Sequence, residues 1–174
     1  MRWPSCTAWL IGVVILGVDA FSKFLTQHYL PLVKSHHVWY PYGGVGVFKD
    51  FLGVEFSINH VINKGAAWGV FYHYQDQLLY FRICLIAAML VYILFYNTKQ
   101  ANTIPLIMIC AGALGNVLDY YLYGHVVDML HFVLWGYDFP VFNLADCAIF
   151  LGISWLFVGS YLSPPVKKTT AKRA

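Results

Sequence analysis

Two aspartates, Asp128 and Asp146, have the side chain and the setting for acid–base chemistry. Each belongs to a short polar motif beside a long apolar stretch, GHVVD at 124–128 and FNLAD at 142–146. A carboxylate close to the hydrocarbon of a membrane is costly, and it is a functional candidate for that reason. Two carboxylates that converge in space can share one proton, which is the arrangement that aspartic proteases use. We therefore treat Asp128 and Asp146 as a candidate pair.

Asp146 has a second interpretation, as part of a helix cap. Asn143 is a good N-cap residue, and Asp146 would then stand three positions into the helix, as in a capping box. Pro140, just upstream, is typical of a helix entry. Capping and chemistry are compatible, because a helix N-terminus stabilises an anion and would favour Asp146 as the ionised member of a pair.

The composition identifies an integral membrane protein. Of the 174 residues, 60% are hydrophobic and only 11% are charged, whereas soluble domains carry about 25% charged residues. Four stretches are long enough to span a bilayer, at about 7–26, 77–96, 102–120 and 144–162. We predict one membrane domain, residues 1–174, of the all-α class, with a small β-sheet outside the membrane.

The basic residues predict the orientation of the spans. Arg2, Lys99 and the lysine-rich tail at 163–174 are expected in the cytoplasm, because cytoplasmic segments are enriched in lysine and arginine. Four spans then place both termini in the cytoplasm. The segments 27–76 and 121–143 are expected on the outer side.

The first outer segment has its own structural signal. Apolar and polar residues alternate over Val54–Asn59, which predicts a half-buried strand and a small sheet on the outer face. Trp39 and Trp135 fit an aromatic belt at the level of the headgroups. Arg82 lies slightly inside the outer edge of the second span, from which its side chain can reach the headgroups.

Several function classes are excluded by the sequence. The net charge of +3 comes with no stripe of basic residues, so nucleic acid is not an expected partner. The chain has no CxxC and no HExxH motif, and no metal or other cofactor is predicted. It also has no GxSxG motif, which leaves serine-based catalysis without support.

Other polar residues fall inside the predicted spans. Asp19 and Lys23 are four residues apart and share a helix face, either as a structural ion pair or as part of a site. Gly112, Asn116 and Asp119 form one stripe on the third span. That stripe is explained either by close helix packing with polar contacts or by the polar floor of a site.

The segment Asn63–Gly69 follows the predicted strand. Its asparagine and glycines, among them Gly65, are typical of a turn, and an ordinary connection between a strand and a helix would explain them. The sequence leaves open whether the segment 63–74 acts as a lid.

Taken in order, these motifs resemble those of the lipoprotein signal peptidases, the type II signal peptidases of bacteria. The resemblance covers about residues 10–160, and five motifs in one order are specific where any single one is weak. The motifs are DAFSK at 19–23, NKGAAWG at 63–69, GALGNVLD at 112–119, GHVVD at 124–128 and FNLAD at 142–146.

The resemblance implies an aspartic endopeptidase of the bacterial cytoplasmic (inner) membrane, with four transmembrane helices and a periplasmic sheet. It would cleave prolipoproteins before a diacylglyceryl-modified cysteine, with Asp128 and Asp146 as the catalytic dyad. Residues implied to bind substrate or support the site are Asp19, Lys23, Asn63, Gly65, Gly112, Asn116, Asp119 and Asn143. The expected partners are the prolipoprotein and membrane lipids, and we expect a monomer.

One position departs from the family pattern. Tyr120 follows Asp119, where the family usually has an arginine. A guanidinium at that place could pair with the aspartate or with a lipid phosphate, so the sequence does not say how Asp119 is held.

Two other functions fit the polar residues of the spans. A proton-coupled transporter or channel subunit could use the aspartates as a relay, although such a relay should cross the membrane depth and these residues map to one half. A structural subunit held together by polar contacts is the third interpretation. It predicts that asparagine substitutions affect stability more than activity.

Overall fold

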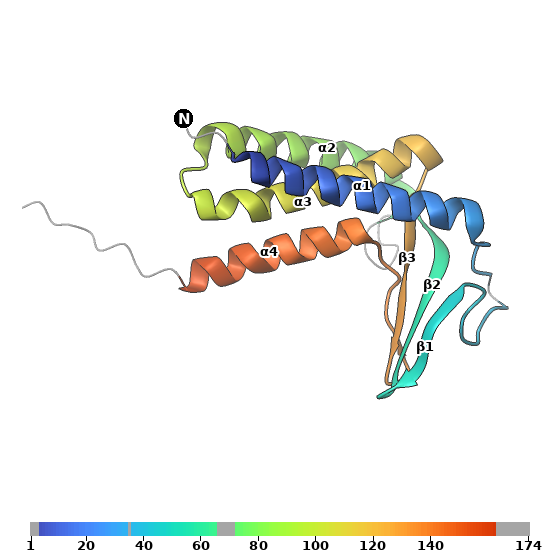
Figure 1. Ribbon diagram of the computed structural model, residues 1–174. Helices are drawn as coiled ribbons and strands as arrows, with labels where there is room; N and C mark the ends of the chain where they lie inside the picture. The colour runs from blue at the N-terminus through green and yellow to red at the C-terminus, as the bar shows by residue number, and fades with distance from the viewer. Residues whose placement is uncertain (1–3, 35, 66–71, 163–174) are drawn as a thin grey trace, which may run out of the picture.

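The computed structural model describes residues 4–34, 36–65 and 72–162. A bundle of four helices has a small antiparallel sheet at one end (Figure 1). The helices are α1 (Cys6–Tyr29), α2 (Gln75–Val91), α3 (Thr103–Tyr123) and α4 (Leu144–Leu162). The strands are β1 (Val45–Phe51), β2 (Val54–Asn63), β3 (Val126–Leu134) and β4 (Tyr137–Asp138). Short helical turns lie at η2 (Tyr72–Tyr74), η3 (Tyr92–Tyr96) and η4 (Gln100–Asn102).

Among the described residues, four helices are long and apolar enough to cross a membrane, in agreement with the four predicted spans. The helical segments that meet this criterion are 6–29, 75–96, 100–123 and 144–162. The third segment is 56% buried inside the protein, whereas the second is only 11% buried. Helix α3 is therefore the centre of the bundle, and most apolar side chains of the other helices are left to face lipid.

Glycines allow α3 to approach its neighbours closely. A Cβ atom on Gly112 would collide with the carbonyl oxygen of Ala145 in α4, and one on Gly115 would collide with the carboxylate of Asp19 in α1. A Cβ on Gly152 of α4 would lie 2.7 Å from the carbonyl oxygen of Pro105. Small residues at such positions let helix backbones pack closely. Within a membrane this packing stabilises helix contacts, because burial of apolar side chains does not drive helices together there.

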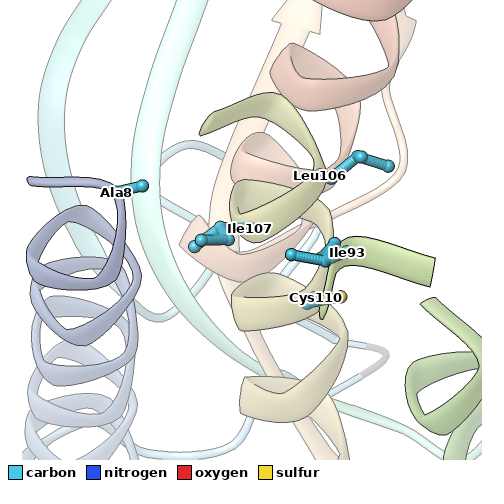
Figure 2. Packing of buried hydrophobic residues seen from close by; sticks show 5 residues of the cluster. All are labelled: Ala8, Ile93, Leu106, Ile107 and Cys110. Carbon is cyan, nitrogen blue, oxygen red and sulfur yellow. The ribbon is translucent and has the colours of Figure 1, made fainter. Parts of the chain in front are cut away.

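The two ends of the bundle differ in chemistry. Far from the sheet, an apolar cluster joins the start of α1, the turn η3 and the start of α3; its members are Ala8, Ile93, Leu106, Ile107 and Cys110 (Figure 2). Towards the sheet, the bundle interior contains charged and amide side chains instead. The polar chemistry of the protein is thus concentrated where the helices meet the strands.

The all-α class is wrong as a description of the whole molecule, because four strands form one antiparallel sheet in the order β1-β2-β3-β4. The sequence predicted a small sheet and one strand, at residues that fall within β2. It did not reveal that β3 continues to Leu134 and pairs with β2. The burial of β3 explains this, since its first four residues are all buried and show no alternation.

Gly124 makes the connection between α3 and β3. It adopts a left-handed conformation, with φ of 75°, and its N–H donates to the carbonyl of Tyr120. Glycine takes this conformation without the penalty that a side chain brings, and so ends the helix and lets the chain turn into the strand. The predicted cytoplasmic tail, Arg2 and the centre of the 63–74 segment lie outside the described residues.

Candidate active site

Asp128 lies near the start of β3 and is 1% exposed. One carboxyl oxygen, Oδ1, accepts a hydrogen bond from Nδ2 of Asn143 at 2.7 Å. The other, Oδ2, accepts from Nδ2 of Asn63, at the end of β2, at 2.9 Å. Burial raises the pKa of Asp128 to about 7, and the charge of Asp146 adds to the rise, although the two asparagine contacts and Lys23 act to lower it. A carboxyl with this pKa retains a proton far more readily than an exposed aspartate.

Asp146 lies in the first turn of α4 and is half-buried. Its Oδ1 accepts a hydrogen bond from Nδ2 of Asn116 at 2.9 Å, and its Oδ2 accepts from the backbone N–H of Asn143 at 3.3 Å. In return, the backbone N–H of Asp146 donates to Oδ1 of Asn143 at 2.9 Å. These reciprocal bonds are a capping box, so the capping interpretation is confirmed. The cap also fixes the direction in which the carboxylate points.

Asn143 links the two carboxyl groups and is fully buried. Its amide nitrogen donates to Asp128, and also to Oδ1 of Asn116 at 3.1 Å. Its amide oxygen and its backbone N–H bind Asp146. The orientation of a single amide is therefore coupled to the positions of both aspartates.

A buried ion cluster stands behind these residues. The ammonium of Lys23 lies 2.8 Å from Oδ2 of Asp19 and 2.8 Å from Oδ2 of Asp119, with the lysine side chain 0% exposed. It also donates to Oδ1 of Asn116 at 2.9 Å. The ion pair predicted between neighbouring turns of α1 is therefore present, and its ammonium is shared with a second carboxylate, that of Asp119 on α3.

The two carboxylates of this cluster also bind backbone groups of other elements. Oδ1 of Asp19 accepts a hydrogen bond from the N–H of Ala145 at 2.8 Å, which satisfies one of the unpaired amides of the first turn of α4. Oδ2 of Asp119 accepts from the N–H of Val127 in β3 at 3.2 Å. The cluster thus joins α1 and α3 to the two elements that carry Asp128 and Asp146.

Comparisons with known proteins decide the family. Residues 11–162 match the family model described as signal peptidase (SPase) II. The chain belongs to the signal peptidase II family. A lipoprotein signal peptidase of Chlamydia trachomatis is 40% identical over 171 residues, which are 97% of this chain and 99% of the relative. That of Enterococcus faecalis is 29% identical over 153 residues, 86% of this chain and 84% of the relative.

A solved structure has the same fold. It is described as a bacterial membrane enzyme, it covers 99% of this chain and 98% of its own, and its TM-score is 0.80 at 24% identity. As a member of the signal peptidase II family, the chain is a membrane peptidase. Nothing in these comparisons supports the alternative of a proton-coupled transporter or channel subunit.

The structure brings the residues matched to signal peptidase II motifs together at one end of the bundle. Hydrogen bonds and ion pairs connect Asp19, Lys23, Asn63, Asn116, Asp119, Asp128, Asn143 and Asp146. Gly65 joins them through its backbone, since its N–H donates to Oδ1 of Asn63 at 2.9 Å. Gly112 has a different role: its lack of a side chain allows the close contact between α3 and α4.

The departure at Tyr120 has a structural explanation. Asp119 is held by Lys23 and by the N–H of Val127, and it needs no arginine beside it. The phenol of Tyr120 instead donates to Oδ1 of Asp76 at 2.5 Å and so connects the C-terminal end of α3 to the start of α2.

Arg82 is the site residue that sequence reasoning missed. We expected its side chain to reach the headgroups, but its Nη2 donates to the carbonyl oxygen of Gly65 at 3.1 Å. The guanidinium also interacts electrostatically with Asp146 and Asp128. A signal was present, because Arg82 is the only charged residue between Asp76 and Lys99, and a lone charge in a span marks a functional position.

Proposed function

We propose that this peptidase is an aspartic endopeptidase that removes signal peptides from bacterial prolipoproteins, cutting before the diacylglyceryl-modified cysteine. The observation that carries the proposal is the bridge through Asn143, one residue that binds Asp128 with its amide nitrogen and Asp146 with its amide oxygen and backbone N–H. Relatives that are named lipoprotein signal peptidases and align over nearly the whole chain support the choice of substrate.

The proposed reaction is general acid–base hydrolysis without a covalent intermediate. Ionised Asp146 takes a proton from a water molecule as the water oxygen attacks the scissile carbonyl. Protonated Asp128 polarises that carbonyl and then gives its proton to the leaving amine as the carbon–nitrogen bond breaks. Two features support these roles: the raised pKa of Asp128, and the place of Asp146 at a helix N-terminus, which stabilises its charge.

Substitution of the pair tests the proposal. Asp128→Asn and Asp146→Asn should each abolish cleavage of a diacylglyceryl-prolipoprotein by the purified enzyme, because an amide can neither accept the water proton nor supply an acidic one. Asp50→Asn is the matched control, since Asp50 is an exposed carboxylate on β1. Substantial turnover by either of the first two variants would exclude the dyad.

We also propose that the site lies on the outer side of the membrane, with both termini in the cytoplasm. The connection between α2 and α3, which contains Lys99, and the start of α1 lie at one end of the bundle, while the sheet, whose strand β3 contains Asp128, lies at the other (Figure 1). The enrichment of basic residues on the cytoplasmic side then favours the outer side for the sheet. Residues 1–174 act as one membrane domain in this proposal. We also propose that the protein acts as a monomer, in which one chain supplies both aspartates.

A further inference from the structure

Arg82 occupies an unfavourable place for a charge. It lies two turns into α2 from Gln75 and is half-buried, in the span with the least burial inside the protein. A guanidinium at this depth costs free energy unless protein groups or water receive its hydrogen bonds. The two aspartates of the proposed cleavage reaction give Arg82 no role in the chemical steps.

A chain of three hydrogen bonds connects Arg82 to Asp128. Nη2 of Arg82 donates to the carbonyl oxygen of Gly65 at 3.1 Å. The N–H of Gly65 donates to Oδ1 of Asn63, and Nδ2 of Asn63 donates to Oδ2 of Asp128, each at 2.9 Å. Because the Gly65 N–H occupies the oxygen end of the Asn63 amide, the nitrogen end must face Asp128. Arg82 thus holds Gly65 by its carbonyl oxygen, and the N–H of the same residue orients the Asn63 amide.

The charge of Arg82 also acts on the aspartate pair, since the guanidinium is attracted to Asp146 and Asp128. The other ionisable groups near the pair are Lys23 and Asp19 of α1, Asp119 of α3 and Cys147 of α4. Lys23 is already shared between two carboxylates, so its cluster carries a net negative charge when both are ionised. Two described cations near the pair lie outside that cluster: Lys64, which is exposed in the turn itself, and Arg82, which is half-buried and interacts with both aspartates.

We propose that Arg82 is a positioning residue of this enzyme, which holds the Asn63–Gly65 turn against Asp128 and whose charge favours ionisation of the Asp128–Asp146 pair. The inference rests on the proposed function. It gives a part in that function to α2, which contributes no residue to the aspartate pair or to the ion cluster of Lys23.

Two variants separate position from charge. Arg82→Lys keeps the charge but loses the planar fork that reaches Gly65, whereas Arg82→Gln loses the charge and keeps an amide donor. The measurement is kcat/KM against pH for the purified full-length enzyme in detergent, with a fluorescent diacylglyceryl-lipopeptide as substrate. Thermal unfolding of each variant shows whether it is folded.

For Arg82→Gln we expect kcat/KM to fall about tenfold or more, because the turn is no longer fixed. Both limbs of the pH profile should move to higher pH by about one unit, since each ionisation of the pair becomes less favourable without the cation. For Arg82→Lys we expect reduced activity with both limbs near their wild-type positions. Lys99→Gln, which removes a cation beyond the far end of the same helix, should leave the profile unchanged.

Two results would overturn the proposal. If the limbs of Arg82→Gln coincide with those of the wild type, the charge has no effect on the pair. If Arg82→Lys has full activity, the turn needs no guanidinium, and this result stands even where Arg82→Gln does not fold. Asp128→Asn and Asp146→Asn are measured beside them. Turnover by those two variants would refute the proposed function of the aspartate pair. That result is distinct from one that refutes only the proposed role of Arg82.

Discussion

Asp128 and Asp146 carry the same side chain in two environments. Asp128 is buried in the sheet and faces amide donors at both oxygens. Asp146 is half-buried and lies at a helix N-terminus, where unpaired backbone N–H groups favour a negative charge. The roles proposed for them, acid for Asp128 and base for Asp146, thus depend on burial and on the direction of a helix.

The raised pKa of Asp128 has a consequence for stability. In the unfolded chain the carboxyl ionises near its usual value of 3.8, whereas in the fold it keeps its proton up to about pH 7. Its contribution to the free energy of unfolding is therefore fully present below about pH 4 and is lost as the pH rises through 7. Asp128→Asn cannot ionise and should lack this loss.

Thermal unfolding of the two proteins in detergent, between about pH 4 and pH 8, measures the difference. We expect the Tm of the wild type to fall relative to that of Asp128→Asn across this interval, with Asp50→Asn following the wild type. Parallel curves for the wild type and Asp128→Asn would contradict the assignment of a raised pKa.

At the scale of the elements, the contact between α3 and α4 decides the geometry of the pair. Asn116 of α3 donates to Asp146 of α4, and that bond requires the two helices to lie close together. Gly112, one turn earlier on α3, is where the backbones meet, because the carbonyl oxygen of Ala145 occupies the space of a side chain. The position of Asp146 thus depends on Gly112, because the lack of a side chain there lets α4 pack closely against α3.

Gly112→Val should force α3 and α4 apart. We expect a loss of about 1–3 kcal/mol in the free energy of unfolding, as for other overpacked contacts. Cleavage should fall with it, because Asp146 moves away from Asn116. Gly17→Val is the matched control, since a Cβ atom at Gly17 in α1 would meet no atom within 4 Å. Thermal unfolding and the cleavage assay check both effects, and equal behaviour of the two variants would contradict the close contact.

At the scale of the whole molecule, the ion cluster of Lys23, Asp19 and Asp119 holds the bundle to the sheet. Its hydrogen bonds reach the first turn of α4 at Ala145 and the start of β3 at Val127. The lysine and both aspartates are almost completely buried. Removing one charge from such a cluster leaves the others without compensation, which costs about 3–5 kcal/mol.

Lys23→Met should therefore destabilise the protein strongly, and it should do so more than any substitution of an exposed lysine such as Lys49. The triple variant Asp19→Asn, Lys23→Met, Asp119→Asn should recover part of the loss, because it contains no unpaired buried charge. Unfolding in detergent of the two variants tests this prediction. A triple variant less stable than Lys23→Met would show that the carboxylates matter through their backbone contacts instead.

The sequence by itself determined the membrane class, the four spans and, with the exception of Arg82, the residues of the candidate site. Composition and apolar length are local properties, because each span must be apolar along its own length to cross lipid. The capping box at Asn143 and Asp146 is local as well, since its partners are three residues apart. Polar residues inside such spans are costly, so their presence alone marked Asp19, Lys23, Asn116 and Asp119.

Only the tertiary structure decided how these residues are connected. Lys23 and Asn116 are 93 residues apart in the chain, and Asn63 and Asp128 are 65 apart, so no periodicity can pair them. The same applies to Arg82. Its position near the end of a span predicts a side chain that reaches the headgroups, whereas in the structure its guanidinium donates to the carbonyl oxygen of Gly65. Contacts between distant segments depend on how helices and strands pack, and one residue's neighbours in sequence do not contain that information.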